Sequence, residues 1–162
     1  MSTLAQAFQQ AMTSGAETPI AIQRFSPAEI RVAMADLVAA DQLLLADALG
    51  VAAMTFYPNA DDVLASCALL AEVRQDWAEA DRLLGQLIAG QGMSATVTSW
   101  RHWVRVIQCQ RETERALIVA QLAVCEHPAD ADLRDELDHL TGLLVNERAM
   151  ATATPSHGIA QH

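Results

Sequence analysis

Few residues of this 162-residue chain have the types and spacing that enzymes use for catalysis. His102 lies beside two tryptophans, Trp100 and Trp103, and two arginines, a setting in which an imidazole can act as a base. No nucleophile partner for it is evident, and the chain contains no G-x-x-x-x-G-K-[ST], G-x-S-x-G, H-E-x-x-H or G-x-G-x-x-G motif. We therefore expect no enzymatic activity and no cofactor.

Metal binding is the other chemistry that the residue types allow. Cys109, Cys125, His102 and His127 could together supply four zinc ligands. However, the chain has only three cysteines and no C-x-x-C pair, and each cysteine stands where small apolar residues pack in helices. The expectation is therefore free thiols and no metal site.

The composition favours an all-α protein. Hydrophobic residues make up 52% of the chain, with Ala and Leu dominant and aromatic residues at only 4%. A net charge of −10 argues against a nucleic-acid partner, because phosphate binding needs a basic surface. The chain contains no run of 18 apolar residues, so we expect no membrane span. No secretory signal is evident after Met1, and we therefore expect a cytoplasmic protein.

The stretch from Asp61 to Met93 contains two amphipathic helical patterns in succession. The segment 74–76 interrupts the apolar pattern between them. Asp76 is expected to cap the second helix, and Glu79 to complete a capping box. A helical hairpin of this size is about one tetratricopeptide repeat long.

The same hairpin is predicted three times, in residues 27–60, 61–96 and 97–130. One tetratricopeptide repeat length counted from Pro27 leads to Asp61, and Pro58 and Pro128 close the first and third units. In the second unit, the turn 90–92 replaces the proline and adds two residues. The predicted fold is a right-handed superhelix of three tetratricopeptide-like hairpins, although Ala-rich helices of a plain helical bundle mimic this pattern.

Local signals mark where these helices begin. Ser26 and Glu29 form a predicted capping box ahead of the first hairpin. Asp41 is expected to cap the second helix of that hairpin. Thr113 is expected to play the same part in the third hairpin, whose turn is the least regular.

Additional segments are predicted at both ends. Residues 1–26 comprise a short helix and an extended link over 16–25, and the helix carries the apolar stripe Leu4, Phe8 and Met12. This stripe either packs on its own domain or forms a dimer contact. A capping helix after Pro128 covers the last hairpin and completes a repeat domain of residues 27–147, and residues 148–162 read as a disordered tail.

Binding chemistry is better represented than catalysis. The first helix of each hairpin in a repeat array lines the concave side. Helical phase gives that floor small apolar side chains in its first half and arginines in its third unit, which can bind a carboxylate or peptide carbonyls. Alternatively, the alanines only let helices approach closely and the arginines are solvated. The predicted groove residues are Arg31, Ala35, Val38, Ala39, Ala65, Leu69, Glu72, Val73, Arg101 and Arg105.

The order of the elements resembles the class II chaperones of bacterial type III secretion systems. The resemblance covers roughly residues 5–146 and includes the segment Ala11-Met12-Thr13-Ser14-Gly15-Ala16, the link, the helix opened by Pro27, three repeats and a terminal helix. It implies a cytoplasmic, virulence-associated chaperone that dimerises through its N-terminal parts. Such a protein binds extended segments of hydrophobic translocator proteins in its groove and keeps them soluble, with no nucleotide.

The chain departs from that family in two places. The first helices of its first two hairpins lack aromatic residues, and its middle turn has glycine in place of proline. A chaperone for needle subunits is therefore an alternative. A second alternative is an adaptor or scaffold that uses the same groove for a folded partner.

Overall fold

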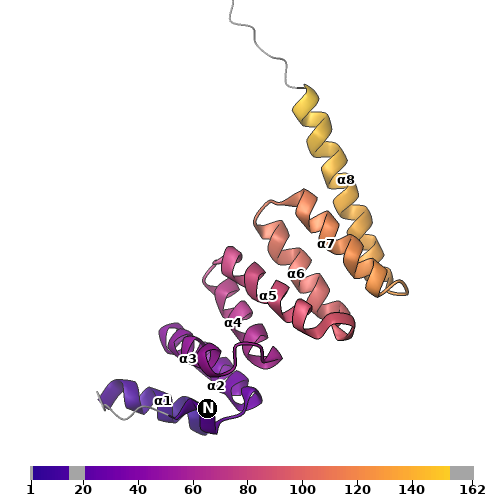
Figure 1. The fold of residues 1–162 in the computed structure, drawn as a ribbon. Coiled ribbons are helices and arrows are strands. Elements are labelled where there is room, and N and C mark those ends of the chain that lie inside the picture. The colour runs from indigo at the N-terminus through magenta and orange to yellow at the C-terminus, as the bar shows by residue number, and fades with distance from the viewer. Residues whose placement is uncertain (1, 15–20, 154–162) are drawn as a thin grey trace, which may run out of the picture. The chain divides into compact units, whose positions relative to one another are not determined.

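The computed structural model describes residues 2–14 and 21–153 of the chain (Figure 1). Within these ranges the protein is all-α, with eight α-helices, two 3-10 turns and no β-strand. In chain order the helices are α1 (Thr3–Ser14), α2 (Pro27–Ala39), α3 (Leu43–Phe56), α4 (Asp61–Val73), α5 (Trp77–Gln91), α6 (Val97–Cys109), α7 (Thr113–Glu126) and α8 (Ala131–Ala153), and the 3-10 turns are η1 (Ile22–Arg24) and η2 (Gly92–Ser94).

The chain divides into two compact units, Met1–Ala95 and Thr96–His162. The boundary follows the stretch that lengthens the second hairpin beyond the regular repeat. There α5 continues to Gln91, and Gly92 ends it with a positive φ of 53°, a conformation that glycine adopts readily.

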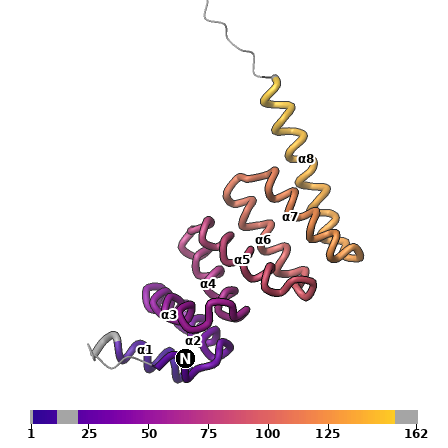
Figure 2. Tube along the Cα trace, in the orientation of Figure 1, coloured from indigo at the N-terminus to yellow at the C-terminus, as the bar shows by residue number. Residues whose placement is uncertain are grey.

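Consecutive helices pack in pairs, α2 with α3 and α4 with α5 in unit 1, and α6 with α7 in unit 2. In Figure 2, α6 and α7 lie side by side and are joined by a short turn. The first helices, α2, α4 and α6, are each 13 residues long, and they begin at Pro27, Asp61 and Val97. The all-α class is therefore confirmed, and the three first helices have equal lengths.

The three hairpin turns share one backbone conformation. Asp41, Gln75 and Arg111 all have a positive φ, of 57°, 60° and 62°, although none of them is glycine. After each, the next N–H donates to a carbonyl in the last turn of the preceding helix, as from Gln42 to Leu37 at 2.8 Å. This is the Schellman arrangement, which satisfies carbonyls at the end of a helix.

Two predicted caps fail because of this turn. Asp41 lies in the left-handed region and not at the N-cap, and Gln42 takes the N-cap position without a side-chain bond. Thr113 is already inside α7, after the N-cap Glu112, and its hydroxyl donates to Glu147 Oε1 at 2.9 Å. The turn between the two helices of each hairpin is one residue longer than a turn in which the first residue caps the second helix. The additional residue is the one with positive φ.

Glycine at the left-handed position should stabilise these turns. For Arg111→Gly we expect a gain of roughly 1 kcal/mol in the free energy of unfolding, because this conformation disfavours a residue with a Cβ by about 1–2 kcal/mol. Gln110→Gly is the matched control, since Gln110 has right-handed φ and ψ and glycine there should destabilise. Urea denaturation compares the two variants, and equal effects would contradict the argument.

Two other predicted N-caps form. The capping box at α2 is complete: Ser26 N–H donates to Glu29 Oε2 at 2.8 Å, and Glu29 N–H donates to Ser26 Oγ at 3.3 Å. Hydrogen bonds from the Ser26 backbone and hydroxyl lower the pKa of the Glu29 carboxyl. Asp76 accepts from Glu79 N–H at 3.2 Å, but the Glu79 carboxylate is bound by Arg82, so only half of that predicted box forms.

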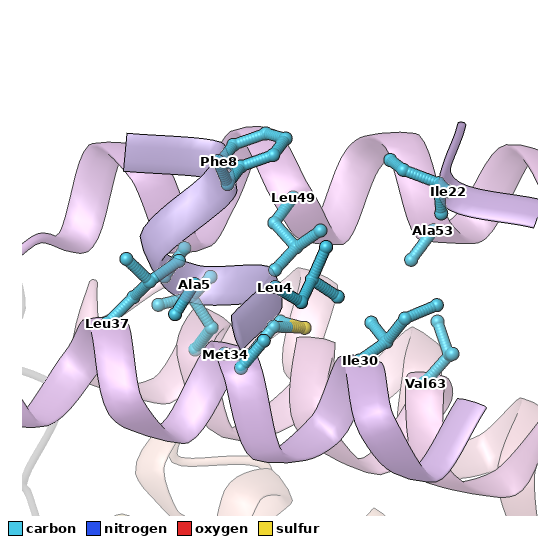
Figure 3. Packing of buried hydrophobic residues seen from close by; sticks show 13 residues of the cluster. Leu4, Ala5, Phe8, Ile22, Ile30, Met34, Leu37, Leu49, Ala53 and Val63 are labelled. Carbon is cyan, nitrogen blue, oxygen red and sulfur yellow. The ribbon is translucent and has the colours of Figure 1, made fainter. Parts of the chain in front are cut away.

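Helix α1 packs on α2 and α3 within unit 1. Leu4 and Phe8 are only 2% and 8% exposed, and Figure 3 shows them among side chains of both helices. Their apolar surface is thus used inside the chain, which is one of the two roles open to the stripe, and is not displayed to a second copy. The side chain of Met12, the third predicted dimer residue, lies outside the described residues. The core around α1 contains Ile22, Ile30, Ala33, Met34, Leu37, Ala46, Leu49, Ala53, Val63 and Leu70.

Two predicted irregular segments differ from the structure. In the expected extended link, residues 22–24 form η1, while residues 16–20 lie outside the described residues. Helix α8 runs to Ala153, beyond the start of the predicted tail at 148, and its last turns project past α7 (Figure 1). Arg148 on α8 donates to Glu114 on α7 at 2.9 Å, and the alanines that follow favour helix. Residues 154–162 of the predicted tail are not described.

None of the described helices combines the length and apolar character needed to cross a lipid bilayer.

Candidate binding face

The predicted groove residues of unit 1 lie together on one face of α2 and α4, here called the α2–α4 face. Residues one repeat length apart occupy matching places on the two helices, so Ala35 corresponds to Leu69 and Ala39 to Val73. The two helices contact each other directly. By helical spacing the face consists of Arg31, Ala35, Val38, Ala39, Asp62, Ala65, Leu69, Glu72 and Val73, of which Val38 is partly buried against the core of unit 1.

The α2–α4 face displays apolar surface because the core side of each helix lies opposite to it. In α2 the buried stripe is Ile30, Ala33, Met34 and Leu37, at helical spacing. On the outer side, Leu69 is 53% exposed and Val73 51% exposed. Small alanines beside them leave room for another chain to approach. The face can therefore bind an apolar segment.

An ion pair closes one end of this face. Arg31 Nε lies 2.9 Å from Asp62 Oδ1, and the two residues stand near the starts of α2 and α4. Both side chains are about half exposed, at 52% and 41%, so the pair contributes little to stability. Arg31 is therefore matched by a carboxylate of its own unit, and the face offers its apolar end to a ligand.

The sequence did not reveal a cavity next to this ion pair. It has a volume of about 310 Å³ and lies between the start of α1 and α2. Phe25, Ala28 and Val32 supply apolar walls, with Arg31 at the edge shared with the α2–α4 face. Finding it required the packing of α1, because a wall contributed by residues 2–4 depends on where that helix docks.

In unit 2, Arg101 forms ion pairs with α8 that the sequence did not predict. Its guanidinium lies 2.9 Å from Asp132 Oδ2 and 3.7 Å from Glu136 Oε2, both on α8. It therefore pairs with carboxylates of its own unit, while 47% of its side chain remains exposed. Arg105, one turn later on α6, is exposed.

The same ion pair occurs in both units with the same separation in sequence. Arg31 pairs with Asp62 and Arg101 pairs with Asp132, each at 2.9 Å. In each unit the pair joins the first helix of a hairpin to a later helix, α4 in unit 1 and α8 in unit 2. An arginine followed at the same distance by an aspartate, once in each unit, is the sequence signal that could have predicted both ion pairs.

Glu136 makes the folding stability of unit 2 depend on pH. Burial raises the pKa of its carboxyl, while Arg101 and His139 oppose the shift, and Oε2 is buried without a hydrogen-bond donor. A raised folded-state pKa means that ionisation costs stability as the pH rises above the ordinary carboxyl value. Asp132, the other carboxylate on Arg101, keeps its 2.9 Å bond.

We therefore expect Glu136→Gln to become progressively more stabilising relative to the native chain as the pH rises above the ordinary carboxyl pKa of about 4. Well below that pH both side chains are neutral and the variants should be alike. Urea denaturation at a series of pH values measures the difference. A gain that is the same at every pH, or one that shrinks as the pH rises, would contradict this assignment.

The remaining candidate chemistry does not assemble. All three cysteines are free thiols, with Cys109 and Cys125 exposed, and burial raises the pKa of Cys67 to about 11. Across residues 2–14 and 21–153, no group of three or more His, Cys, Asp or Glu side chains is arranged to hold a metal ion. Trp100 and Trp103 have ring centroids 5.9 Å apart and tilted by 36°, so they pack on each other beside His102.

No protein-family model matches the chain, and no curated protein matches it either.

Proposed function

We propose that the protein is a cytoplasmic chaperone of a bacterial type III secretion system, which holds a hydrophobic translocator protein before export. The observation that carries this proposal is the α2–α4 face, on which Leu69 and Val73 are each about half exposed beside small side chains. An export substrate must stay unfolded without aggregating. A partner that covers its apolar segments achieves this.

The architecture supports the proposal. Three hairpins with first helices of equal length, which begin at Pro27, Asp61 and Val97, fit a tetratricopeptide array wound as a right-handed superhelix. In such an array the first helices line the concave side, which is where an extended segment binds. Helix α8 acts as the terminal helix that covers the last hairpin.

The charge distribution fits a solubilising role. The chain has 20 acidic residues against 10 arginines and no lysine. A strongly acidic surface around an apolar face keeps a complex with an apolar polypeptide dissolved. Binding of this kind uses no nucleotide and no metal.

Coexpression tests the proposal directly. The protein is expressed in its native cell, and copurifying proteins are identified by mass spectrometry. The strongest candidate is then produced alone and together with the protein. The proposal requires that the candidate be insoluble alone, be soluble in the complex, and carry an apolar segment protected from proteolysis. If the only stable partner is a folded protein that is soluble by itself, the protein is an adaptor or scaffold and the proposal is wrong.

A further inference from the structure

The cavity between the start of α1 and α2, here called the α1–α2 cavity, is bounded mainly by apolar surface. The apolar part of its lining comes from Leu4, Phe25, Ala28 and Val32. Its volume of about 310 Å³ is near the lower limit of ligand pockets, which hold about 300–1,000 Å³. A space of this size suits one large side chain of a bound polypeptide.

The walls of the α1–α2 cavity are held in place by contacts within unit 1. Leu4 is only 2% exposed and packs in the core cluster (Figure 3). At the start of α1, the Ser2 N–H donates to the Asp36 carboxylate on α2. The Tyr57 hydroxyl donates to the Phe25 carbonyl at 3.0 Å, which fixes the opposite wall. The cavity is therefore preformed, so a side chain that enters it has little of the protein to order.

The apolar surface of the cavity continues across α2 onto the α2–α4 face. Val32, which is 43% exposed, stands three residues before Ala35, and residues three apart are neighbours on a helix surface. Ala28 and Arg31 are related in the same way, and Arg31 belongs both to the cavity lining and to the face. An extended chain that lies on Leu69 can therefore reach the cavity by crossing α2.

Charge favours an uncharged apolar side chain in the α1–α2 cavity. The lining contains one acidic and one basic residue, Glu29 and Arg31. Both are matched within unit 1, since the Ser26 N–H donates to Glu29 at 2.8 Å and Arg31 lies 2.9 Å from Asp62. A charged side chain would lose hydration on entering without meeting an unmatched charge, whereas an apolar side chain gains free energy by leaving water.

We infer that the α1–α2 cavity receives a large apolar side chain of the same extended export segment that lies on the α2–α4 face. This inference rests on the proposed function, and it gives α1 a part in binding, because the first residues of that helix form one wall of the site. The ligand is thus an extended polypeptide with one large apolar residue in addition to those that cover Leu69 and Val73.

A neutral amino-acid analogue tests the cavity without the export substrate. N-acetyl-phenylalaninamide is titrated into the isotope-labelled full chain, and the backbone amide signals are followed by nuclear magnetic resonance. The largest shifts should fall on Phe25, Ala28 and Val32, which line the cavity. N-acetyl-alaninamide, which lacks the aromatic ring, should shift the same signals far less.

Ala28→Trp should fill the cavity from its α2 wall. Ala28 is exposed, so the variant should fold, which circular dichroism verifies. The substitution should remove the shifts caused by the analogue. It should also weaken binding of the coexpressed apolar substrate by at least about tenfold, the factor that burial of one large apolar side chain contributes. Val32→Asp, which places a charge on the cavity wall, should weaken substrate binding similarly.

Ala78→Trp is the matched control, because Ala78 is the second residue of α5 as Ala28 is of α2, and both are exposed. It should leave the shifts and substrate binding unchanged. The inference is overturned if the analogue shifts no cavity residue, if Ala78→Trp weakens binding equally, or if Ala28→Trp and Val32→Asp bind the substrate as the native chain does. Each of these results leaves the proposed function intact, which fails instead if no apolar substrate copurifies.

Discussion

Replacing Leu69 and Val73 together by aspartate should abolish copurification of the apolar export substrate while leaving the helical content unchanged. Each side chain offers about half of its surface to a ligand. Loss of that contact, with desolvation of two new charges, should weaken binding by about 3 kcal/mol or more, over a hundredfold. Copurification and circular dichroism on the double variant provide the two readouts.

Unit 2 supplies a closely matched control. Ile118 and Leu122 on α7 are 57% and 51% exposed, and they too are separated by one turn of a single helix. Replacing them by aspartate changes charge and apolar exposure by similar amounts, and we expect substrate to remain bound. If the Leu69 and Val73 variant still copurifies its substrate, the α2–α4 face is not the binding site.

A second large effect is expected from Leu49→Ala. Leu49 is fully buried between α3 and the helices that pack on it, in the cluster shown in Figure 3. Truncating a buried leucine leaves a cavity and typically costs about 2–5 kcal/mol. Ala46 and Ala53, which are buried about one turn before and after Leu49 on α3, are too small to fill the space.

Urea denaturation measures this loss, and hydrogen exchange locates it. Protection should fall in α1, α2 and α3, whose side chains form the cluster. Leu69→Ala is the control for side-chain size, since it removes the same atoms from a position that is 53% exposed. A loss below about 1 kcal/mol for Leu49→Ala would mean that the core closes around the missing atoms.

The helices were predictable because their signals are local. Ser26, Pro27 and Glu29 fix the start of α2 within one turn, and the apolar spacing of α4 and α5 fixes which side of each is buried. The repeat period follows from counting along the chain. The left-handed turns escaped prediction because Asp41, Gln75 and Arg111 are not glycine, and only the geometry of the chain reversal requires that conformation.

Sequence spacing groups the candidate residues of unit 1 on one face, but it does not predict the ion pairs of Arg101 in unit 2. Helical phase suffices to group Ala35, Leu69 and Val73, since each lies opposite a buried stripe. The role of Arg101 depends on where α8 docks, which single-helix periodicity does not contain. The same limit applies to Leu4 and Phe8, because an apolar stripe does not state whether it packs within one chain or between two.

The pairing of helices with near neighbours along the chain has a consequence for how the protein is made. The main helix contacts join elements at most two apart in sequence, such as α2 with α4. Chains with such short loops to close fold fast, on the order of microseconds to milliseconds, whereas a ribosome adds only about 5–20 residues per second. Each hairpin can thus form while the next is being synthesised. Limited proteolysis of stalled nascent chains should find α2–α3 already protected once α4 has emerged.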